Sequence, residues 1–373
     1  MTIEFDRRSI LAGIFCTSIV GSRALSDDAA HATTPVPTKK PPAPFPCPDR
    51  KLSDLGIQYT VVNAETKTPV ILNVNPDIDA QTFKTFRPPA SLTKMHTIFK
   101  AGEVIEAGLA RLSDNVTISS IVDDLARPPI GPFRLSGATA GSTFTLEEIL
   151  TATGTYSCAS CAIATAVYIG EKIQPSALEN QKERENAHLD TFIEAINQSA
   201  NDLGMVDTKI FTPSGRPLYP SSARCYIDKA ETTPYDMALL TIALQARFPN
   251  LAAKTMGQAR VDSPITTDKT HTNAGLLANY DHVKFVKTGT TTNAGNCLAL
   301  YSELRGHKLA GVIMGARGGY PNALMLSILE KAVELIENPA PLPLHMPDEL
   351  IALREEALTM PHGHENAELI HNL

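Results

Sequence analysis

The folded part of this chain begins and ends with β-forming sequence, and helix-forming sequence lies between. Near its start, Gln58 to Val62 and Val70 to Val74 are rich in β-branched and aromatic residues and are separated by polar residues, as in a hairpin. Three similar segments lie near its end: Lys284 to Lys287, Cys297 to Tyr301 and Leu309 to Met314. This order predicts an α+β fold in which both ends of the chain build one sheet and a helical part is inserted in sequence.

Helical periodicity marks the region between the two groups of strands. From Leu92 to Ala107 apolar residues recur at helical spacing, directly after the helix-breaking pair Pro88-Pro89. Ser91 is a good capping residue, so we expect it at or just inside the N-terminus of this helix. Three further helices are expected in this region: Thr145 to Leu150, Ser157 to Ile169 and Glu179 to Ala200. A closing helix, Leu324 to Ile336, is expected after the last strand.

The N-terminal residues 1–32 have the pattern of an export signal. Arg7-Arg8 precede an apolar run from Ile10 to Val20, and Ala30-His31-Ala32 fits a small-x-small cleavage site. The paired arginines resemble a twin-arginine signal, so we expect a periplasmic or other extracytoplasmic location. A short buried helix and an uncleaved membrane anchor are the alternatives.

The remaining chain divides into a linker, a domain and a tail. Residues 33–50 are Pro-rich and predict an extended linker, and residues 51–338 form the expected catalytic domain. The tail, residues 339–373, includes His362, His364 and His371 but is expected to be disordered rather than a metal site. No run approaches the roughly 18 apolar residues that span a bilayer, so membrane association is not required.

Charge and cysteine content limit the classes of function. The net charge is −7 with 33 Lys and Arg residues spread along the chain, which argues against a nucleic-acid binder. Cys158 and Cys161 have no second ligand pair at a zinc spacing and no thioredoxin-like context. We therefore expect Cys161 to be a buried structural cysteine, while the pairing of the six cysteines stays open.

Ser91-Leu92-Thr93-Lys94 is the first candidate for chemistry. A serine hydroxyl becomes an effective nucleophile when a neighbouring group takes its proton. Residues three apart lie on one helix face, so Lys94 is expected to reach the Ser91 oxygen. Lys94 acts as a base only when neutral, which requires burial or a nearby positive charge to lower its pKa. The positive end of the helix would favour an oxyanion forming beside Ser91.

Lys287-Thr288-Gly289, on a predicted strand, is the second candidate. Lys287 and Thr288 would offer a charge and a hydroxyl to a carboxylate, and Gly289 would let a substrate backbone approach this strand closely. Together with the segment from Arg87 to Met95, this motif resembles the D-alanyl-D-alanine carboxypeptidases. These are the low-molecular-mass penicillin-binding proteins of the serine β-lactamase and DD-peptidase superfamily.

Further segments between Lys51 and Asn338 resemble the same family, and we expect them to shape the fold rather than take part in chemistry. They include Leu203-Gly204-Met205, Pro213-Ser214-Gly215, Tyr235-Asp236-Met237-Ala238 and Ala294-Gly295.

The family's usual Ser-Gly-Asn motif is replaced by Ser157-Cys158-Ala159. Ser157 matches, and a helix cap is its alternative role. Ala159 cannot make the side-chain hydrogen bonds that asparagine makes with the substrate and the catalytic lysine. Ser160, one turn away, is a candidate substitute.

The resemblance implies acyl transfer by three catalytic residues. Lys94 would take the proton of Ser91, Ser91 would attack the carbonyl of a terminal D-alanyl-D-alanine, and Ser157 would relay a proton to the leaving D-alanine. Backbone N–H groups of Ser91 and Thr290 would form the oxyanion hole. The terminal carboxylate would be held by Lys287, Thr288 and Thr290.

The resemblance also implies the fold and the partners. It implies a DD-peptidase fold, an antiparallel sheet flanked by helices with an inserted helical subdomain, and peptidoglycan stem peptides as substrate. β-Lactams would acylate Ser91, and no metal or organic cofactor is needed. A DD-endopeptidase, a β-lactamase on the same fold and a peptidoglycan-binding pseudoenzyme are the alternatives. No clear deacylating glutamate motif supports the β-lactamase, and Ala159 is what motivates the pseudoenzyme.

Overall fold

The structure is a computed structural model. It describes residues 56–73, 87–122, 137–216, 230–266, 272–291, 293–318 and 321–338. The expected export signal, linker and C-terminal tail lie outside the described residues, as does Val74 at the end of the second expected strand. Among the helices that are described, none has the length and apolar character needed to cross a membrane.

Both ends of the domain contribute strands to one antiparallel sheet, with the order β2-β1-β7-β6-β5. The strands are β1 (Gln58–Asn63), β2 (Pro69–Asn73), β5 (Val283–Thr291), β6 (Gly295–Leu304) and β7 (His307–Ala316). β1 pairs with β7, with Gln58 opposite Met314. The predicted α+β architecture is therefore confirmed, and β5 forms one edge of this sheet.

Successive side chains of the sheet enter two different hydrophobic clusters, because strand side chains alternate between the faces. Leu298 and Leu300 pack in the cluster that includes α10 (Asn322–Glu337), whereas Ala299 packs in the cluster of the central helices. On β5, Phe285 belongs to the helical cluster and Val286 to the α10 cluster. The same alternation puts Lys287 on the face that the central helices cover.

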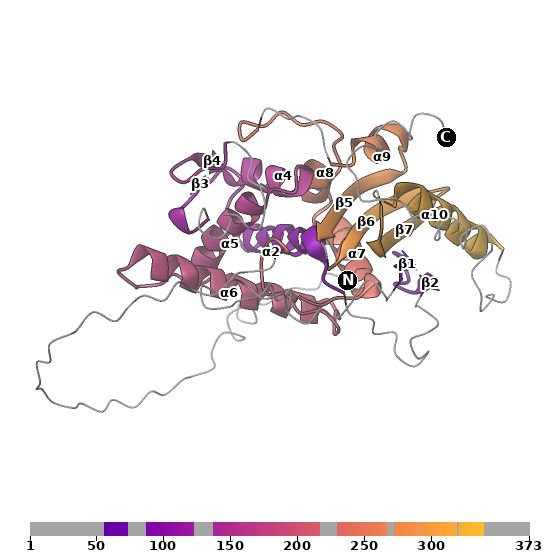
Figure 1. Cartoon of the computed structure of the whole chain (residues 1–373), viewed down its shortest axis with the longest axis horizontal. Helices are drawn as coiled ribbons and strands as arrows, with labels where there is room; N and C mark the ends of the chain where they lie inside the picture. The colour runs from indigo at the N-terminus through magenta and orange to yellow at the C-terminus, as the bar shows by residue number, and fades with distance from the viewer. Residues whose placement is uncertain are drawn as a thin grey trace, which may run out of the picture. The chain divides into compact units, whose positions relative to one another are not determined.

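Helices between β2 and β5 cover that face, as Figure 1 shows for α2 at their centre. α2 (Lys94–Glu106) is buried along most of its length, which is expected of a helix enclosed by others. It contacts α4 (Leu146–Thr155), α5 (Ala159–Ile173), α6 (Gln181–Asp202), α7 (Pro234–Arg247) and α8 (Pro249–Met256). The side chain of Lys94, at the start of α2, thus enters a densely packed interior.

The expected helices are present, with shifted ends. A capping box between Thr145 and Glu148 starts α4 where the sequence predicts it. The helix expected from Ser157 starts instead at Ala159, with Cys158 as its N-cap. Elements that were not predicted include α8, α9 (Ala274–Asn279) and the strands β3 (Asn115–Thr117) and β4 (Thr143–Thr145), which pair with each other.

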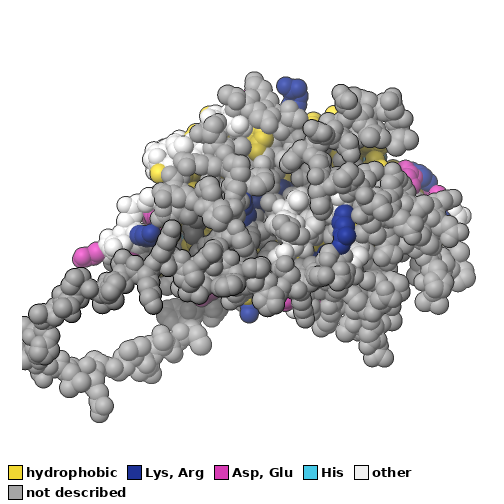
Figure 2. Space-filling model, in the orientation of Figure 1, with side chains coloured by type: hydrophobic (Ala, Val, Ile, Leu, Met, Phe, Trp, Pro, Cys, Tyr) yellow, Lys and Arg dark blue, Asp and Glu magenta, His cyan; other side chains and the backbone are white. Residues whose placement is uncertain are grey.

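Charged side chains are dispersed over the face drawn in Figure 2, where the described Lys and Arg side chains lie apart from one another. Ion pairs instead join neighbouring elements. Arg247 of α7 bonds to both Glu103 and Glu106 at the end of α2. Partly exposed pairs of this kind contribute little stability, on the order of 1 kcal/mol or less.

Candidate active site

Ser91 lies in a short 3-10 turn, η2 (Ala90–Thr93), that runs directly into α2. Ser91 thus lies just inside the N-terminus of the helical run, as expected from the sequence, although its side chain does not cap the run. The chain is already helical from Ala90, Thr93 is the N-cap of α2, and neither turn has a side-chain cap. The hydroxyl of Ser91 is instead engaged by Lys94, and the side chain is partly exposed.

Lys94 makes the contact that its spacing from Ser91 predicts. Its Nζ donates to Ser91 Oγ at 2.8 Å and to the carbonyl oxygen of Ser214 at 2.7 Å. The side chain is fully buried. Burial, followed by the positive charges of Lys287 and Arg216, holds the pKa of Lys94 well below its ordinary value. A neutral amine beside a serine oxygen is therefore favoured at this position.

The segment from Thr212 to Arg216 holds η2, the turn that contains Ser91, in place. Thr97 Oγ1 donates to the carbonyl oxygen of Pro213 at 2.7 Å, next to the bond between Lys94 and Ser214. Gly215 has a φ of +72°, and a Cβ on it would lie 1.6 Å from the carbonyl oxygen of Ala90. From the sequence, this segment was expected only to shape the fold. The contact with Lys94 uses a main-chain carbonyl, for which the sequence carries no signal.

Strand β5 brings a second lysine and a second serine together. Lys287 Nζ donates to Ser157 Oγ at 2.8 Å and to the carbonyl oxygen of Thr288 at 2.8 Å. Lys287 is also fully buried, and this burial lowers its pKa to about 7. Ser157 is partly exposed and has a φ of +56°, the left-handed region that non-glycine residues rarely adopt. The site thus contains two Ser–Lys pairs.

Gly289 allows β5 to pack closely against η2, the turn that contains Ser91. A Cβ on Gly289 would lie 2.7 Å from the backbone nitrogen of Ser91 and 3.0 Å from that of Leu92. A larger residue would push this strand away from Ser91. The sequence predicted that a substrate backbone would approach this glycine closely. In the structure, the backbone of Ser91 lies close to it.

In the predicted carboxylate site, the side chains of the two threonines have different hydrogen-bond partners from that of Lys287. Thr288 Oγ1 donates to Thr272 Oγ1 at 3.4 Å, and Thr290 Oγ1 donates to Asn296 Oδ1 at 2.7 Å. Thr288 is buried, whereas Thr290 is exposed. The three residues lie close together on β5, but their side chains have separate partners in the structure.

The second motif carries no asparagine-like side chain. Ala159 is buried as the first residue of α5, and Ser160 beside it is fully buried. Ser160 Oγ has no hydrogen-bond partner among the described residues, so nothing in its contacts supports the substitution for asparagine suggested from the sequence. A helix cap was the alternative role for Ser157, and Cys158 takes that position.

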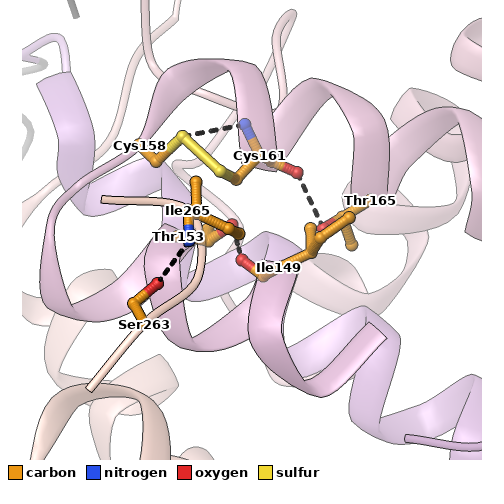
Figure 3. Close-up of a disulfide and its surroundings, with 7 residues drawn as sticks. All are labelled: Ile149, Thr153, Cys158, Cys161, Thr165, Ser263 and Ile265. Atoms are coloured by element: carbon orange, nitrogen blue, oxygen red, sulfur yellow. Dashed lines mark hydrogen bonds between the residues drawn. A yellow bond between two sulfur atoms is a disulfide. The ribbon is translucent and has the colours of Figure 1, made fainter. Parts of the chain in front are cut away.

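Cys158 and Cys161 form a disulfide at the first turn of α5 (Figure 3). Cys161 is buried, as expected, but the sequence left its pairing open. Cys158 Sγ also accepts a hydrogen bond from the backbone nitrogen of Cys161 at 3.1 Å. Within the described ranges, no cluster of three or more His, Cys, Asp or Glu side chains could hold a metal ion.

These contacts define what the site can do chemically. Ser91 has a buried amine of lowered pKa at hydrogen-bond distance, which is the arrangement of a serine nucleophile with its base. Ser157 and Lys287 form a second polar pair on the strand that packs against Ser91. Together they can support attack on a carbonyl carbon and proton delivery to a leaving group.

Comparisons with known proteins point to one group. A family model described as D-alanyl-D-alanine carboxypeptidase matches residues 61–318. The D-alanyl-D-alanine endopeptidase of Escherichia coli (strain K12) is 28% identical over 149 residues, which are 38% of this chain and 44% of that protein. The chain thus spans less than half the length of this curated relative.

Solved structures with the same fold include two at 20% identity. Penicillin-binding protein D2 of Listeria monocytogenes, in a cefotaxime-bound form, has a TM-score of 0.56 and is covered over 95% of its chain and 74% of this one. A mutant of the Streptomyces K15 DD-transpeptidase has a TM-score of 0.58, with 96% of its chain and 75% of this one covered. At this identity the likeness establishes the shared fold.

Proposed function

The chain belongs to the D-alanyl-D-alanine carboxypeptidase family, and from this premise we propose that it removes the terminal D-alanine of peptidoglycan stem peptides through an acyl-enzyme on Ser91. The observation that carries the proposal is the 2.8 Å contact between Ser91 Oγ and the buried Nζ of Lys94. It gives this chain a nucleophile and a base in contact, as an acyl-transfer reaction requires.

The first step is attack by Ser91. Neutral Lys94 has a lone pair that accepts the hydroxyl proton, and its two N–H groups can keep the bond to the carbonyl oxygen of Ser214. Ser91 Oγ then bonds to the penultimate D-alanine carbonyl carbon. Backbone N–H groups of Ser91 and Thr290 would stabilise the oxyanion, each by about 3 kcal/mol.

The second step is loss of the terminal D-alanine. Ser157 would pass a proton to the leaving amine, and Lys287 supports this role because it donates to Ser157 Oγ. Lys287, Thr288 and Thr290 would bind the substrate carboxylate. To bind it, Lys287 and Thr290 would replace some of their present hydrogen bonds with bonds to the substrate. Charged Lys287 has three N–H donors with which to do so. Water then releases the acyl-enzyme and regenerates Ser91.

A DD-endopeptidase that cuts peptide cross-links is the second candidate function. The relative from Escherichia coli carries that name. Both reactions attack the same kind of carbonyl, and they differ in whether the leaving group is free D-alanine or a D-alanine attached to a second stem peptide. The substrate assay below therefore includes both substrates.

Three further properties belong to the proposal. β-Lactams would acylate Ser91, a reaction supported by the cefotaxime-bound form of the Listeria protein with the same fold. The protein would act outside the cytoplasm, where peptidoglycan lies, and the predicted leader in residues 1–32 supports this location. A catalytic domain of residues 51–338 would carry the activity.

The test combines a label and two substrates. The purified protein is incubated with a fluorescent penicillin, and separately with a diacetylated tripeptide ending in D-Ala-D-Ala and with a purified cross-linked dimer. Stable labelling of wild type, no labelling of Ser91→Ala, and release of D-alanine support the carboxypeptidase. Ser113→Ala is the matched control, because Ser113 is an exposed serine of a surface turn; it should label as wild type does.

Other outcomes favour the alternatives. Cleavage of the dimer without D-alanine release supports the endopeptidase. Rapid loss of label with hydrolysis of the antibiotic supports a β-lactamase. Absence of a label that depends on Ser91, together with binding of peptidoglycan, would support the pseudoenzyme and overturn the proposed function.

A further inference from the structure

The conformation of Ser157 needs an explanation beyond its hydrogen bond with Lys287. Its φ of +56° is unfavourable for a residue with a Cβ, so neighbouring structure must hold it there. Left-handed Ser157 is followed at once by the N-cap of α5. The direction in which its hydroxyl points therefore depends on how the chain is held at the next residue, Cys158.

On its N-terminal side Ser157 follows Tyr156, whose hydroxyl donates to the carbonyl oxygen of Val261 at 2.8 Å. On its C-terminal side the chain has few side-chain bonds to hold it. Ala159 has no polar side chain, and Ser160 Oγ has no hydrogen-bond partner among the residues that the structure describes. Cys158 is held from both sides: its backbone nitrogen donates to the carbonyl oxygen of Ala152 at 3.2 Å, and its sulfur is bonded to Cys161. The covalent ring thus holds the residue directly after Ser157.

The disulfide is anchored in the protein interior. Both cysteines are buried and belong to the hydrophobic cluster of the central helices. Thr165 Oγ1 donates to the carbonyl oxygen of Cys161 at 2.9 Å, one turn further along α5. Figure 3 shows this bond, and the disulfide spanning the first turn of the helix. The ring is therefore fixed to a rigid helix at one end and to Ser157 at the other.

A ring this small acts locally. A disulfide constrains the unfolded chain more when the loop it closes is longer, and here only Ala159 and Ser160 lie between the cysteines. Its main effect should fall on the folded state, on the turn that it closes and on the residue before that turn. This separates it from a disulfide that stabilises the whole domain.

We propose that the Cys158–Cys161 disulfide is the positioning element that holds the Ser157 hydroxyl against Lys287, so that the site acylates efficiently only in its oxidised form. The proposal rests on the proposed function, because its readout is acylation of Ser91. The cysteines do not contact the reacting atoms; they act through Ser157.

The redox step requires a dithiol reductant. One thiolate of the dithiol attacks a sulfur of the disulfide, and its second thiolate resolves the mixed disulfide. Two electrons and two protons pass to Cys158 and Cys161, which become thiols, while the dithiol becomes a disulfide. The turn then loses its covalent closure, and Ser157 can relax from the left-handed conformation.

The test is a double-mutant cycle on the full chain. The variant Cys158→Ser/Cys161→Ser removes the ring but keeps a good helix cap at position 158. We expect its second-order rate constant for acylation by a penicillin, followed by intact mass over hours, to fall by about tenfold or more with little change in Tm. In a Ser157→Ala background, the same two substitutions should cause no further loss, because the residue that the ring positions is already changed.

Reduction of the unaltered protein is the second arm. Dithiothreitol treatment, with thiol formation at both cysteines verified by alkylation and mass spectrometry, should slow acylation by a similar factor, and reoxidation should restore the rate. The Cys158→Ser/Cys161→Ser variant should not respond to either treatment. This arm needs no substitution and therefore holds even if a variant folds poorly.

Three results would overturn the inference. Wild-type acylation rates in the double cysteine variant and in the reduced protein would show that the ring positions nothing. An equal loss in the Ser157→Ala background would assign the effect to general structure. Failure of oxidised wild type to acylate at Ser91 would instead remove the proposed function, and the inference with it.

Discussion

Lys287 donates a hydrogen bond of 2.8 Å to Ser157 Oγ across 130 positions of sequence. The bond connects the sheet to the helical part, because Lys287 lies on β5 and Ser157 directly precedes the cap of α5. It also places a second buried amine near Lys94, and its charge helps to lower the pKa of Lys94. The two Ser–Lys pairs are therefore electrostatically coupled.

Lys94→Arg tests the requirement for a neutral amine. Arginine has a long basic side chain like lysine but does not lose its proton in proteins, so it cannot take the Ser91 proton. We expect the acylation rate to fall by about 10²–10⁴-fold, the usual contribution of a general base. Lys100→Arg, on the same helix and paired with Glu103, is the matched control and should acylate at the wild-type rate. Equal rates in both variants would contradict the assigned base.

Lys287 should make the stability of the protein depend on pH. Its folded-state pKa is about 7, whereas an unfolded lysine titrates near 10.4. Between these values the unfolded chain binds a proton that the folded protein has released, so the free energy of unfolding rises with pH in that window. The contribution is flat below the folded-state pKa, where Lys287 is charged in both states.

Urea unfolding at several pH values measures this slope. Lys287→Met should remove part of the rise, up to about 1.4 kcal/mol per pH unit within the window. Lys284→Met changes a partly exposed lysine of the same strand and should keep the wild-type slope. A slope that is unchanged in Lys287→Met would mean that Lys287 stays charged in the folded protein.

Gly215→Ala tests whether the close packing of Gly215 against Ala90 holds the turn that contains Ser91. The added methyl group would collide with the carbonyl oxygen of Ala90, so we expect Ser91 to shift and acylation to slow by at least about tenfold. Gly204→Ala is the matched control: Gly204 has a similar φ of +79° but open space around it. It should lose about 1 kcal/mol of stability and keep its acylation rate. Equal acylation rates in the two variants would show that the packing of Gly215 against Ala90 does not position Ser91.

Ala159→Asn tests the departure in the second motif. If the missing amide limits substrate positioning, this substitution should raise the rate of acylation or of turnover. Turnover is measured as the rate of D-alanine release. Ala159→Leu adds a side chain of similar size without hydrogen-bonding groups and should not raise either rate. Because Ala159 is buried, Tm is measured in parallel to detect overpacking. A rate that stays at or below wild type in a stably folded Ala159→Asn variant would contradict this interpretation of the motif.

Local spacing was enough to predict part of the site. The contact of Lys94 with Ser91 follows from helical geometry alone, and Lys287 lies on a strand, as the sequence predicted. The position of the sheet-forming segments at both ends of the domain likewise predicted the α+β architecture. These predictions rest on the regular periodicity of individual helices and strands.

Long-range packing fixed the rest, and the sequence carries little sign of it. The carbonyl of Ser214 contacts Lys94 through the main chain, so no side chain marks it. Ser157 adopts a left-handed φ that its residue type disfavours, and the pairing of Cys158 with Cys161 closes the first turn of α5. Ser91 lies just inside the helix start, as predicted, but the helix begins with a 3-10 turn, and the serine hydroxyl accepts a hydrogen bond from Lys94 instead of capping the helix.

The pairing of β1 with β7 has a consequence for biosynthesis. The first strand of the sheet pairs early with β2 on one side, but its partner on the other side, β7, is made after all the helices between them. The ribosome must therefore release most of the domain before this sheet is complete. Ser91 and Lys94 emerge early, but Lys287 and Gly289 arrive late. A nascent chain truncated before β5 would carry Ser91 and Lys94 without the strand that packs against them, and under the proposed function it would not yet act on substrate.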